Sequence, residues 1–318
     1  MNYIDSKTIR GLRPYSRWID TIEEAMLLKP GHDYIMPLRT HIDFDDNTLL
    51  LMPCIAKKYF STKLVSLYPG NASAGKPPLK GMIVLNDRTD GEPLAILDGP
   101  AITAMRTAAV GGFAVRHLSP ADASSLGVIG LGTQGLHQAL FACAERKIKE
   151  ITVFDCRNDS CQLFIRNFNA VYPDIKISIA ESTERVCKQS EIIITATNSK
   201  EPVLPDDEDI LRGKTFIGIG SYKKDMREFP DSLFRLADRI YTDTLHGLKE
   251  SGDLIYPLEN MIMDKTDFLE AVSLLNDRDL PGTTRVFKSV GMALFDLLAS
   301  VLVYETVIKA GQQPLSAQ

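Results

Sequence analysis

Gly130, Gly132 and Gly135 have the spacing G-x-G-x-x-G, which suits a turn that binds phosphate groups. They follow the short apolar stretch 126–129 and precede residues 136–146, which contain no helix breaker. The first glycine permits a tight turn, the second lets the backbone approach a pyrophosphate, and the third lets the helix pack on the strand. The helix N-terminus offers free N–H groups to the phosphates. This stretch predicts a dinucleotide site; the alternative is a strand–turn–helix unit without a ligand.

An acidic residue follows the next predicted strand, at the position expected for a ribose contact. Residues 151–154 form that strand, and Asp155 comes about 20 residues after Gly135. A carboxylate accepts hydrogen bonds from the ribose 2′-OH and repels a 2′-phosphate, so Asp155 favours NAD(H). Arg157 could soften this preference, which leaves NADP(H) open.

Five further residues are predicted to contact the cofactor from the loops of the same domain. Thr133 and Gln134 lie between the second and third glycines. Thr197 and Asn198 end a predicted strand at its carboxyl edge, where ligands bind in open α/β sheets. Ser221 follows the next predicted strand.

Three cations precede the glycine motif, and two of them lie in contexts that suggest burial. Arg39 lies in P-L-R-T, Lys63 lies in the predicted strand S-T-K-L-V-S-L, and Arg106 lies in the small-residue helix A-M-R-T-A-A-V-G-G. A buried arginine needs an anionic partner, and its planar guanidinium matches a carboxylate. If the three cations converge, they form a carboxylate-binding site. The alternative for each is an ordinary surface or ion-paired residue.

The chain before the glycine motif predicts a mixed α+β domain. Residues 1 to about 30 are expected to be helical, and residues 99–117 are expected to form a second helix that Pro120 ends. Between them, short strands separated by turn residues predict a mostly antiparallel sheet. These strands are expected at 34–40, 48–52, 59–67, 82–85 and 94–98.

From about residue 121, predicted strands alternate with predicted helices, which indicates a doubly wound parallel sheet of the Rossmann type. The strand at 239–243 is expected to be the last of this sheet. An apolar helix after about residue 287 is expected to return to the first domain, and the tail from residue 312 to be disordered. Asp296 on that helix is expected either to pair with a nearby basic residue or to cap polar atoms at the site.

Composition excludes several classes of function. A chain of 318 residues suggests two domains. The net charge of −5 and the lack of a basic run argue against a nucleic-acid partner. No uninterrupted apolar stretch of about 18 residues and no signal-peptide pattern are present, so no membrane partner is expected. The five cysteines lack C-x-x-C spacing, which argues against disulfides and metal sites and favours the cytoplasm.

Six stretches spread over nearly the whole chain resemble the ornithine cyclodeaminase/mu-crystallin family. They are K-L-V-S-L-Y-P-G-N (63–71), G-E-P-L-A-I-L-D-G (91–99), M-R-T-A-A-V-G-G (105–112), G-V-I-G-L-G-T-Q-G (127–135), T-A-T-N-S-K-E-P-V (195–203) and V-F-K-S-V-G-M-A-L-F-D (286–296). The resemblance implies a nicotinamide-binding Rossmann domain, expected at 119–287, inserted into a substrate and dimerisation domain, expected at 1–118 plus 288–318. It also implies a homodimer. Arg39, Lys63 and Arg106 would then hold the α-carboxylate of a small amino- or imino-acid substrate.

One position departs from the pattern of the ammonia-eliminating members. In those members an aspartate contacts the substrate amino group, whereas the run G-I-G-S-Y-K-K-D-M-R-E (218–228) places Tyr222 there and Asp225 elsewhere. Ketimine reductases of the mu-crystallin type also lack this aspartate. The resemblance therefore favours reduction of the C=N bond of a small α-imino acid such as 1-pyrroline-2-carboxylate.

Lys63 is the first candidate for the proton donor in this reaction, because the pKa of a lysine falls readily beside other cations. Tyr222, or a water that it holds, is the second. Three alternatives remain open: ornithine cyclisation with release of ammonia, an alanine- or opine-type amino-acid dehydrogenase, and a non-catalytic protein that binds NAD(P)H or a small ligand.

Overall fold

The computed structural model describes residues 1–77, 79–276 and 283–309, and their contacts form two compact units. The first unit is Met1–Arg106 with Met292–Gln318, and the second is Thr107–Gly291. The boundary between residues 106 and 107 falls inside the long helix α3 (Gly99–Leu118). The tail from residue 312, expected to be disordered, lies outside the described residues.

The first unit is built on a seven-stranded sheet with the order β1-β7-β6-β5-β4-β2, and β3 pairs with β4. All neighbouring strands are antiparallel except β1, which pairs in parallel with β7. The predicted, mostly antiparallel sheet is therefore confirmed. The strands are β1 (Asn2–Ile4), β2 (Tyr34–Ile35), β3 (Thr40–Phe44), β4 (Asn47–Ala56), β5 (Tyr59–Leu67), β6 (Leu79–Asp87) and β7 (Pro93–Asp98).

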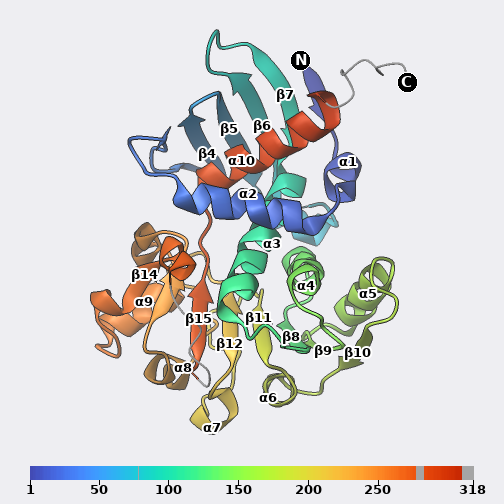
Figure 1. The fold of residues 1–318 in the computed structure, drawn as a ribbon, viewed down its shortest axis with the longest axis vertical. Coiled ribbons are helices and arrows are strands. Elements are labelled where there is room, and N and C mark those ends of the chain that lie inside the picture. The colour runs from blue at the N-terminus through green and yellow to red at the C-terminus, as the bar shows by residue number, and fades with distance from the viewer. Residues whose placement is uncertain (78, 277–282, 310–318) are drawn as a thin grey trace. The chain divides into compact units, whose positions relative to one another are not determined.

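Two helices cover one face of this sheet. The helix α10 (Ala293–Tyr304) contacts β4, β5 and β6, and α2 (Tyr15–Leu27) packs against α10 (Figure 1). Since successive side chains on a strand alternate between faces, every second residue is buried from Met52 to Ala56 in β4 and from Tyr59 to Val65 in β5. The expected return of the C-terminal helix to the first domain is confirmed.

The prediction of a helical N-terminus is only partly right. Asn2–Ile4 forms β1 through backbone pairing with β7, which a local helical pattern does not reveal. Two helices follow, α1 (Ser6–Gly11) and α2. Asp5 begins α1 by accepting a hydrogen bond from the backbone N–H of Thr8 at 2.8 Å, and Pro14 precedes α2.

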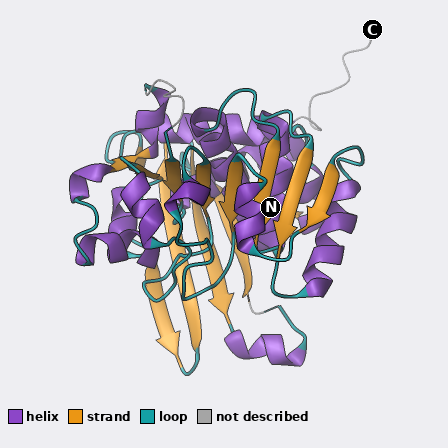
Figure 2. Cartoon of the chain, turned by 90° about the horizontal axis from the view of Figure 1, so that it is seen from below, coloured by secondary structure: helices purple, strands orange, loops and turns teal. Residues whose placement is uncertain are grey.

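The second unit contains an eight-stranded sheet with the order β10-β9-β8-β11-β12-β15-β13-β14, in which every pair is parallel. Figure 2 shows the strands of both sheets in orange. The predicted doubly wound sheet is confirmed. The strand order reverses at β8, where such sheets bind their ligands. The strands are β8 (Ser125–Ile129), β9 (Glu150–Phe154), β10 (Lys176–Ile179), β11 (Ile192–Thr195), β12 (Thr215–Gly218), β13 (Ile240–Thr242), β14 (Phe268–Glu270) and β15 (Arg285–Lys288).

Helices connect these strands. The α-helices of the second unit after α3 are α4 (Thr133–Glu145), α5 (Asn158–Asn169), α6 (Thr183–Lys188), α7 (Glu208–Leu211), α8 (Asp231–Leu236) and α9 (Gly252–Glu259). Short 3-10 turns are η1 (Pro69–Ala74), η2 (Leu245–Lys249), η3 (Lys265–Asp267) and η4 (Ala271–Leu275), and a π-turn, η5 (Glu305–Lys309), follows α10. Within the described ranges, no helix is long and apolar enough to cross a bilayer.

The expectation that 239–243 is the last strand is wrong, because β14 and β15 follow it. The strand β15 inserts between β12 and β13. Its four residues, R-V-F-K, carry a charge at each end and run directly into the apolar stretch that is expected to form the C-terminal helix. That helix begins at Ala293 rather than near residue 287.

Candidate functional site

The first unit contains a buried cluster of two cations and one carboxylate. Lys63 donates to Asp296 with a distance of 2.6 Å between Nζ and Oδ2, and Arg106 donates to the same carboxylate with 3.1 Å between Nε and Oδ1. The three residues are 3%, 7% and 1% exposed, and they come from β5, α3 and α10. One anion facing two cations leaves a net positive charge, which suits the binding of a further anion.

The local sequence explains why each side chain points inward. Lys63 lies on the covered face of β5 and pairs with the buried residues Met52 and Ile83 on the neighbouring strands. Arg106 lies among alanines in α3, and these leave room for the guanidinium. Asp296 lies in the first turn of α10, where the helix dipole favours a negative charge.

Burial and neighbouring charges shift the pKa values of this cluster. Burial, followed by the charges of Arg106 and Arg39, lowers the pKa of Lys63 to about 8, against the opposing attraction of Asp296. Burial alone would raise the pKa of Asp296, but Lys63 and Arg106 outweigh it and hold that pKa below its usual value. The shift in the Lys63 pKa also places the half-exposed Arg39 within electrostatic reach of the cluster.

The structure thus brings Lys63 and Arg106 together, and the charge of Arg39 contributes to the lowered pKa of Lys63. For Asp296 it shows the first of the two expected arrangements, pairing with basic residues. That these cations bind a substrate carboxylate stays a prediction.

The glycine motif of the second unit connects β8 to α4. Gly130 has φ +90°, and a Cβ there would lie 2.7 Å from the carbonyl oxygen of Ala196. A Cβ at Gly135 would lie 2.0 Å from the carbonyl oxygen of Gly130. Beside Gly132, in contrast, no atom of the described part of the chain lies within 4 Å of that position. The outer glycines are therefore required by the fold, and the middle one leaves open space in front of the backbone, as a pyrophosphate needs.

The helix terminus and the acidic residue also fit a dinucleotide. No side chain of the described residues caps the N-terminus of α4 at Gly132. Asp155 accepts hydrogen bonds from the backbone N–H of Leu131 at 2.8 Å and of Arg157 at 2.9 Å. Each carboxylate oxygen can accept more than one hydrogen bond, so a ribose hydroxyl can still be bound. The Arg157 side chain is mostly exposed, with its Nε 3.7 Å from Asp155 Oδ1.

The remaining predicted cofactor residues lie around this edge of the sheet. Thr133 is exposed in the glycine loop. Gln134 is half-buried, and its side-chain oxygen meets no hydrogen-bond partner among the described residues. Thr197 donates its hydroxyl to Glu228 at 2.8 Å, and Asn198 is exposed. These positions agree with the predicted edge, and their contacts with a cofactor stay predictions.

Ser221 and Tyr222 follow β12. Ser221 is fully buried, and its hydroxyl donates to the carbonyl oxygen of Met226 at 2.6 Å. Its side chain therefore serves the fold, which leaves its backbone for any cofactor contact. Tyr222 is 49% exposed, and the Lys223 ammonium lies 5.8 Å from the centre of its ring.

Sequence reasoning missed a buried ionic cluster in the second unit. Glu228, Asp253 and Lys288 are all fully buried there, at the carboxyl ends of β11, β12 and β15. The sequence offers little local signal for this cluster beyond the charged pair R-E at 227–228. Among the described residues, no group of three or more His, Cys, Asp or Glu side chains is placed to hold a metal.

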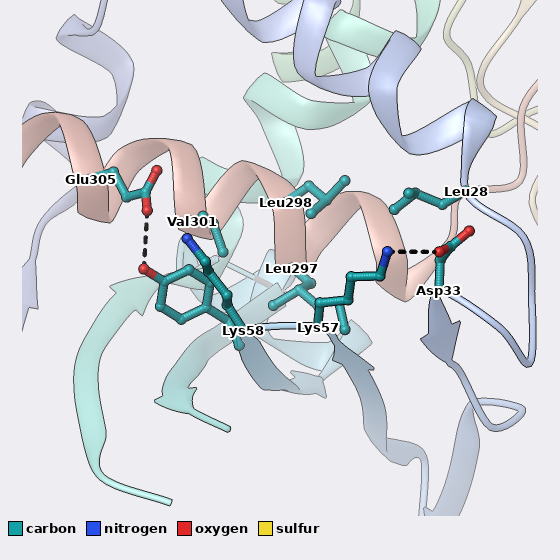
Figure 3. A pocket seen from close by; sticks show the side chains of 10 residues that line it. Leu28, Asp33, Lys57, Lys58, Leu297, Leu298, Val301 and Glu305 are labelled. Carbon is teal, nitrogen blue, oxygen red and sulfur yellow. Dashed lines mark hydrogen bonds and ion pairs between the residues drawn. The ribbon is translucent and has the colours of Figure 1, made fainter. Parts of the chain in front are cut away.

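A pocket of about 340 Å³ in the first unit is separate from these clusters (Figure 3). Its polar groups pair with one another: Lys57 lies 3.3 Å from Asp33, and the Tyr59 hydroxyl donates to Glu305 at 3.0 Å. None of the predicted site residues lines it. The lining consists of Leu28, Asp33, Ala56, Lys57, Lys58, Tyr59, Leu297, Leu298, Val301 and Glu305.

Comparison with known proteins gives the same picture over nearly the whole chain. The model of the ornithine cyclodeaminase/mu-crystallin family matches residues 5–311. A Delta(1)-pyrroline-2-carboxylate reductase of Bacillus cereus is 29% identical over 289 residues, which are 87% of each chain. The ketimine reductase mu-crystallin of Mus musculus is 30% identical over 303 residues, 93% of each chain. The structure of Thermococcus litoralis Delta(1)-pyrroline-2-carboxylate reductase in complex with NADH and L-proline aligns with a TM-score of 0.90, 30% identity and 98% coverage of both chains.

Proposed function

Because the chain belongs to the ornithine cyclodeaminase/mu-crystallin family, we propose that it is an NAD(H)-dependent reductase of small α-imino acids, with 1-pyrroline-2-carboxylate as the favoured substrate. The observation that carries the proposal is the buried cluster of Lys63, Arg106 and Asp296, whose excess positive charge suits a carboxylate. The reductases among its relatives support the choice of a C=N bond.

The carboxylate of the substrate would be bound by the cations of this cluster. Asp296 engages Nε of Arg106. The terminal nitrogens of that guanidinium would then present paired N–H donors to the substrate. Arg39 and the Lys63 ammonium would add charge, and the fixed carboxylate would orient the imine carbon.

Reduction of the imine needs one hydride and one proton. Bound NADH supplies the hydride to the imine carbon. Lys63 would donate the proton to the imine nitrogen, because a pKa of about 8 leaves the ammonium protonated at neutral pH but more acidic than an ordinary lysine. Tyr222 remains the second candidate for this step. The product is the corresponding cyclic amino acid.

A direct assay tests this function. Purified protein given 1-pyrroline-2-carboxylate should consume NADH, followed by the loss of its absorbance, and should use NADPH less well because Asp155 repels a 2′-phosphate. In parallel, ornithine with catalytic NAD should release little ammonia. Rapid ammonia release without imine reduction would establish the cyclodeaminase alternative instead. Oxidation of alanine or an opine would indicate a dehydrogenase, and NADH binding without turnover on any of these substrates would indicate a binding protein.

We also infer that the protein is a homodimer that joins through the outer face of the first unit's sheet. That face carries cross-strand apolar neighbours, Leu51 beside Leu64 and Leu64 beside Met82, and Ile42 is exposed on β3. An exposed apolar sheet face of this kind is typical of a protein interface. Light scattering should give about twice the 35.3 kDa of one chain, and Leu64→Lys should shift the mass toward the monomer. A wild-type monomer at micromolar concentration would contradict the proposal.

The proposed compartment is the cytoplasm. All five cysteines are free thiols, and Cys54, Cys161 and Cys187 are buried. Free thiols are typical of proteins in a reducing environment.

A further inference from the structure

We propose that Glu228 is a positioning residue for the cofactor: its buried carboxylate fixes the two loops that follow β11 and β12. This inference rests on the proposed binding of NAD(H) at the carboxyl edge of the second unit's sheet. No direct contact between Glu228 and the cofactor is required.

The carboxylate of Glu228 joins the two loops through five hydrogen bonds. Its Oε1 accepts from the backbone N–H of Thr197 at 2.7 Å and from the hydroxyl of the same residue at 2.8 Å. Its Oε2 accepts from the hydroxyl of Thr195 at 3.0 Å and from the backbone N–H groups of Gly220 and Ser221 at 2.8 and 3.3 Å. Glu228 is fully buried, so these donors have no water to replace it.

The glycines of the G-I-G run at the end of β12, Gly218 and Gly220, make room for this arrangement. A Cβ at Gly220 would lie 2.4 Å from Oε1 of Glu228 and 2.0 Å from the carbonyl oxygen of Thr197. A Cβ at Gly218 would lie 2.5 Å from the ring of Phe229 and 3.0 Å from Cδ of Lys288. Both glycines therefore serve the buried carboxylate and its cation.

The contacts of Glu228 also reach the glycine loop. The Cβ position of Gly130 lies 2.8 Å from Cγ2 of Thr197, and the backbone N–H of Ala196 donates to the carbonyl oxygen of Ile129 at 2.8 Å. Glu228 thus holds Thr197, and Thr197 packs against the first glycine of the dinucleotide motif. A shift of the β11 loop would displace the turn that is expected to approach the pyrophosphate.

A second carboxylate and a cation hold Glu228 itself. Lys288 Nζ lies 3.7 Å from Oε2 of Glu228 and 3.4 Å from Oδ2 of Asp253. Oδ1 of Asp253 accepts from the backbone N–H groups of Glu228 and Phe229 at 2.8 and 3.0 Å. Lys288 therefore offsets the buried negative charge, while Asp253 fixes the backbone that carries Glu228.

The geometry predicts that even glutamine, an amide of the same size, cannot replace Glu228 in holding both loops. Both carboxylate oxygens face backbone N–H groups, Thr197 on one side and Gly220 with Ser221 on the other. A glutamine has only one acceptor oxygen, so either orientation sets its NH₂ group against a backbone donor that cannot rotate away. Glu228→Gln should therefore release one of the two loops.

The test measures NADH binding by titration of the cofactor fluorescence. Glu228→Gln and Glu228→Ala should raise the Kd for NADH about tenfold or more. The KM for the imine at saturating NADH should stay within about threefold of wild type, since the cation cluster is not touched. Thr195→Val removes one donor with little change in volume, and it should raise the Kd by a smaller factor in a folded protein.

Glu191→Ala is the matched control in the same unit. Glu191 accepts from the backbone N–H groups of Ser124 and Ser125 at 2.8 and 3.0 Å, at the amino ends of β8 and β11. Glu191→Ala should lower the melting temperature and leave the Kd for NADH unchanged. An unchanged Kd in folded Glu228→Gln, or an equal rise in Glu191→Ala, would overturn the proposal. Wild type that binds NADH but reduces no imine would overturn the proposed substrate and leave this inference standing, and wild type that binds no NADH would overturn both.

Discussion

Lys63→Met should lower kcat/KM for imine reduction by roughly 100- to 10,000-fold, the range of general acid catalysis. The variant removes both the proton that the imine nitrogen needs and one cation that holds the carboxylate. Among the described residues, it also leaves the Asp296 carboxylate with one ion-pair partner, Arg106, at 3.1 Å. The measurement is the initial rate of NADH oxidation with 1-pyrroline-2-carboxylate, together with the Kd for NADH, which should not change.

Two further variants separate the proton from the charge. Lys63→Arg keeps the cation, but a guanidinium does not give up a proton in this pH range. The kcat should therefore still fall strongly, while the KM for the imine should rise less than in Lys63→Met. Lys58→Met changes an exposed lysine in the turn just before β5, and its kinetics should match wild type. Activity of Lys63→Met within about threefold of wild type would remove Lys63 from the site.

The pH profile checks the same role. Since the Lys63 pKa lies at about 8, the ammonium is protonated below that pH and loses its proton above it. The value of kcat/KM in wild type should therefore fall as the pH rises through 8. In Lys63→Arg this alkaline fall should be absent, because arginine stays charged. An identical profile in both proteins would assign the ionisation to another group, with Tyr222 the next to test.

The part of the site that sequence predicts is the part encoded locally. The glycine motif, its strand and Asp155 lie within one strand–helix–strand unit, so their spacing alone implies their geometry. Lys63 stood out because a lysine interrupts the buried side of an alternating strand, and Arg106 because small residues surround it. Each of these signals is a motif, or a charged residue in an apolar or small-residue context, within a few residues of sequence.

Contacts between residues that lie far apart in the sequence could not be predicted from such local patterns. Asp296 lies 233 positions from Lys63 and 190 from Arg106, and nothing in its neighbourhood chooses between pairing and capping. Glu228 and Lys288 likewise meet only because β15 inserts between β12 and β13. Strand order in a parallel sheet follows from the packing of the whole unit, and a four-residue strand such as β15 carries too little pattern to reveal its place.

Asp296→Asn should destabilise the protein more than any other single change in the cation cluster. It leaves Lys63 and Arg106 buried without their shared anion, and breaking a buried ion pair costs about 3–5 kcal/mol of the free energy of unfolding. The melting temperature should fall by roughly 5–15 °C. Asp46→Asn, at an exposed acid in the turn between β3 and β4, is the matched control and should melt like wild type.

The lowered pKa of Asp296 sets the direction in which the stability of the folded protein changes with pH. Its stabilising effect is complete above the unfolded pKa of about 3.9 and is lost as the pH falls through the lower folded value. The difference in melting temperature between wild type and Asp296→Asn should therefore shrink in acid. Without the attraction of Asp296, the Lys63 pKa should fall below 8, so the alkaline fall of kcat/KM should move to lower pH.

The double variant Lys63→Met with Asp296→Asn separates stability from catalysis. In wild type, two cations and one anion leave one net positive charge, whereas Asp296→Asn leaves two. The double variant returns the cluster to one positive charge, on Arg106, so its melting temperature should lie above that of Asp296→Asn while its reductase activity stays lost. If the melting temperature did not recover, the loss of stability in Asp296→Asn would come from packing at α10 rather than from unpaired charge. Asp296 would then not be the counter-ion that keeps Lys63 protonated.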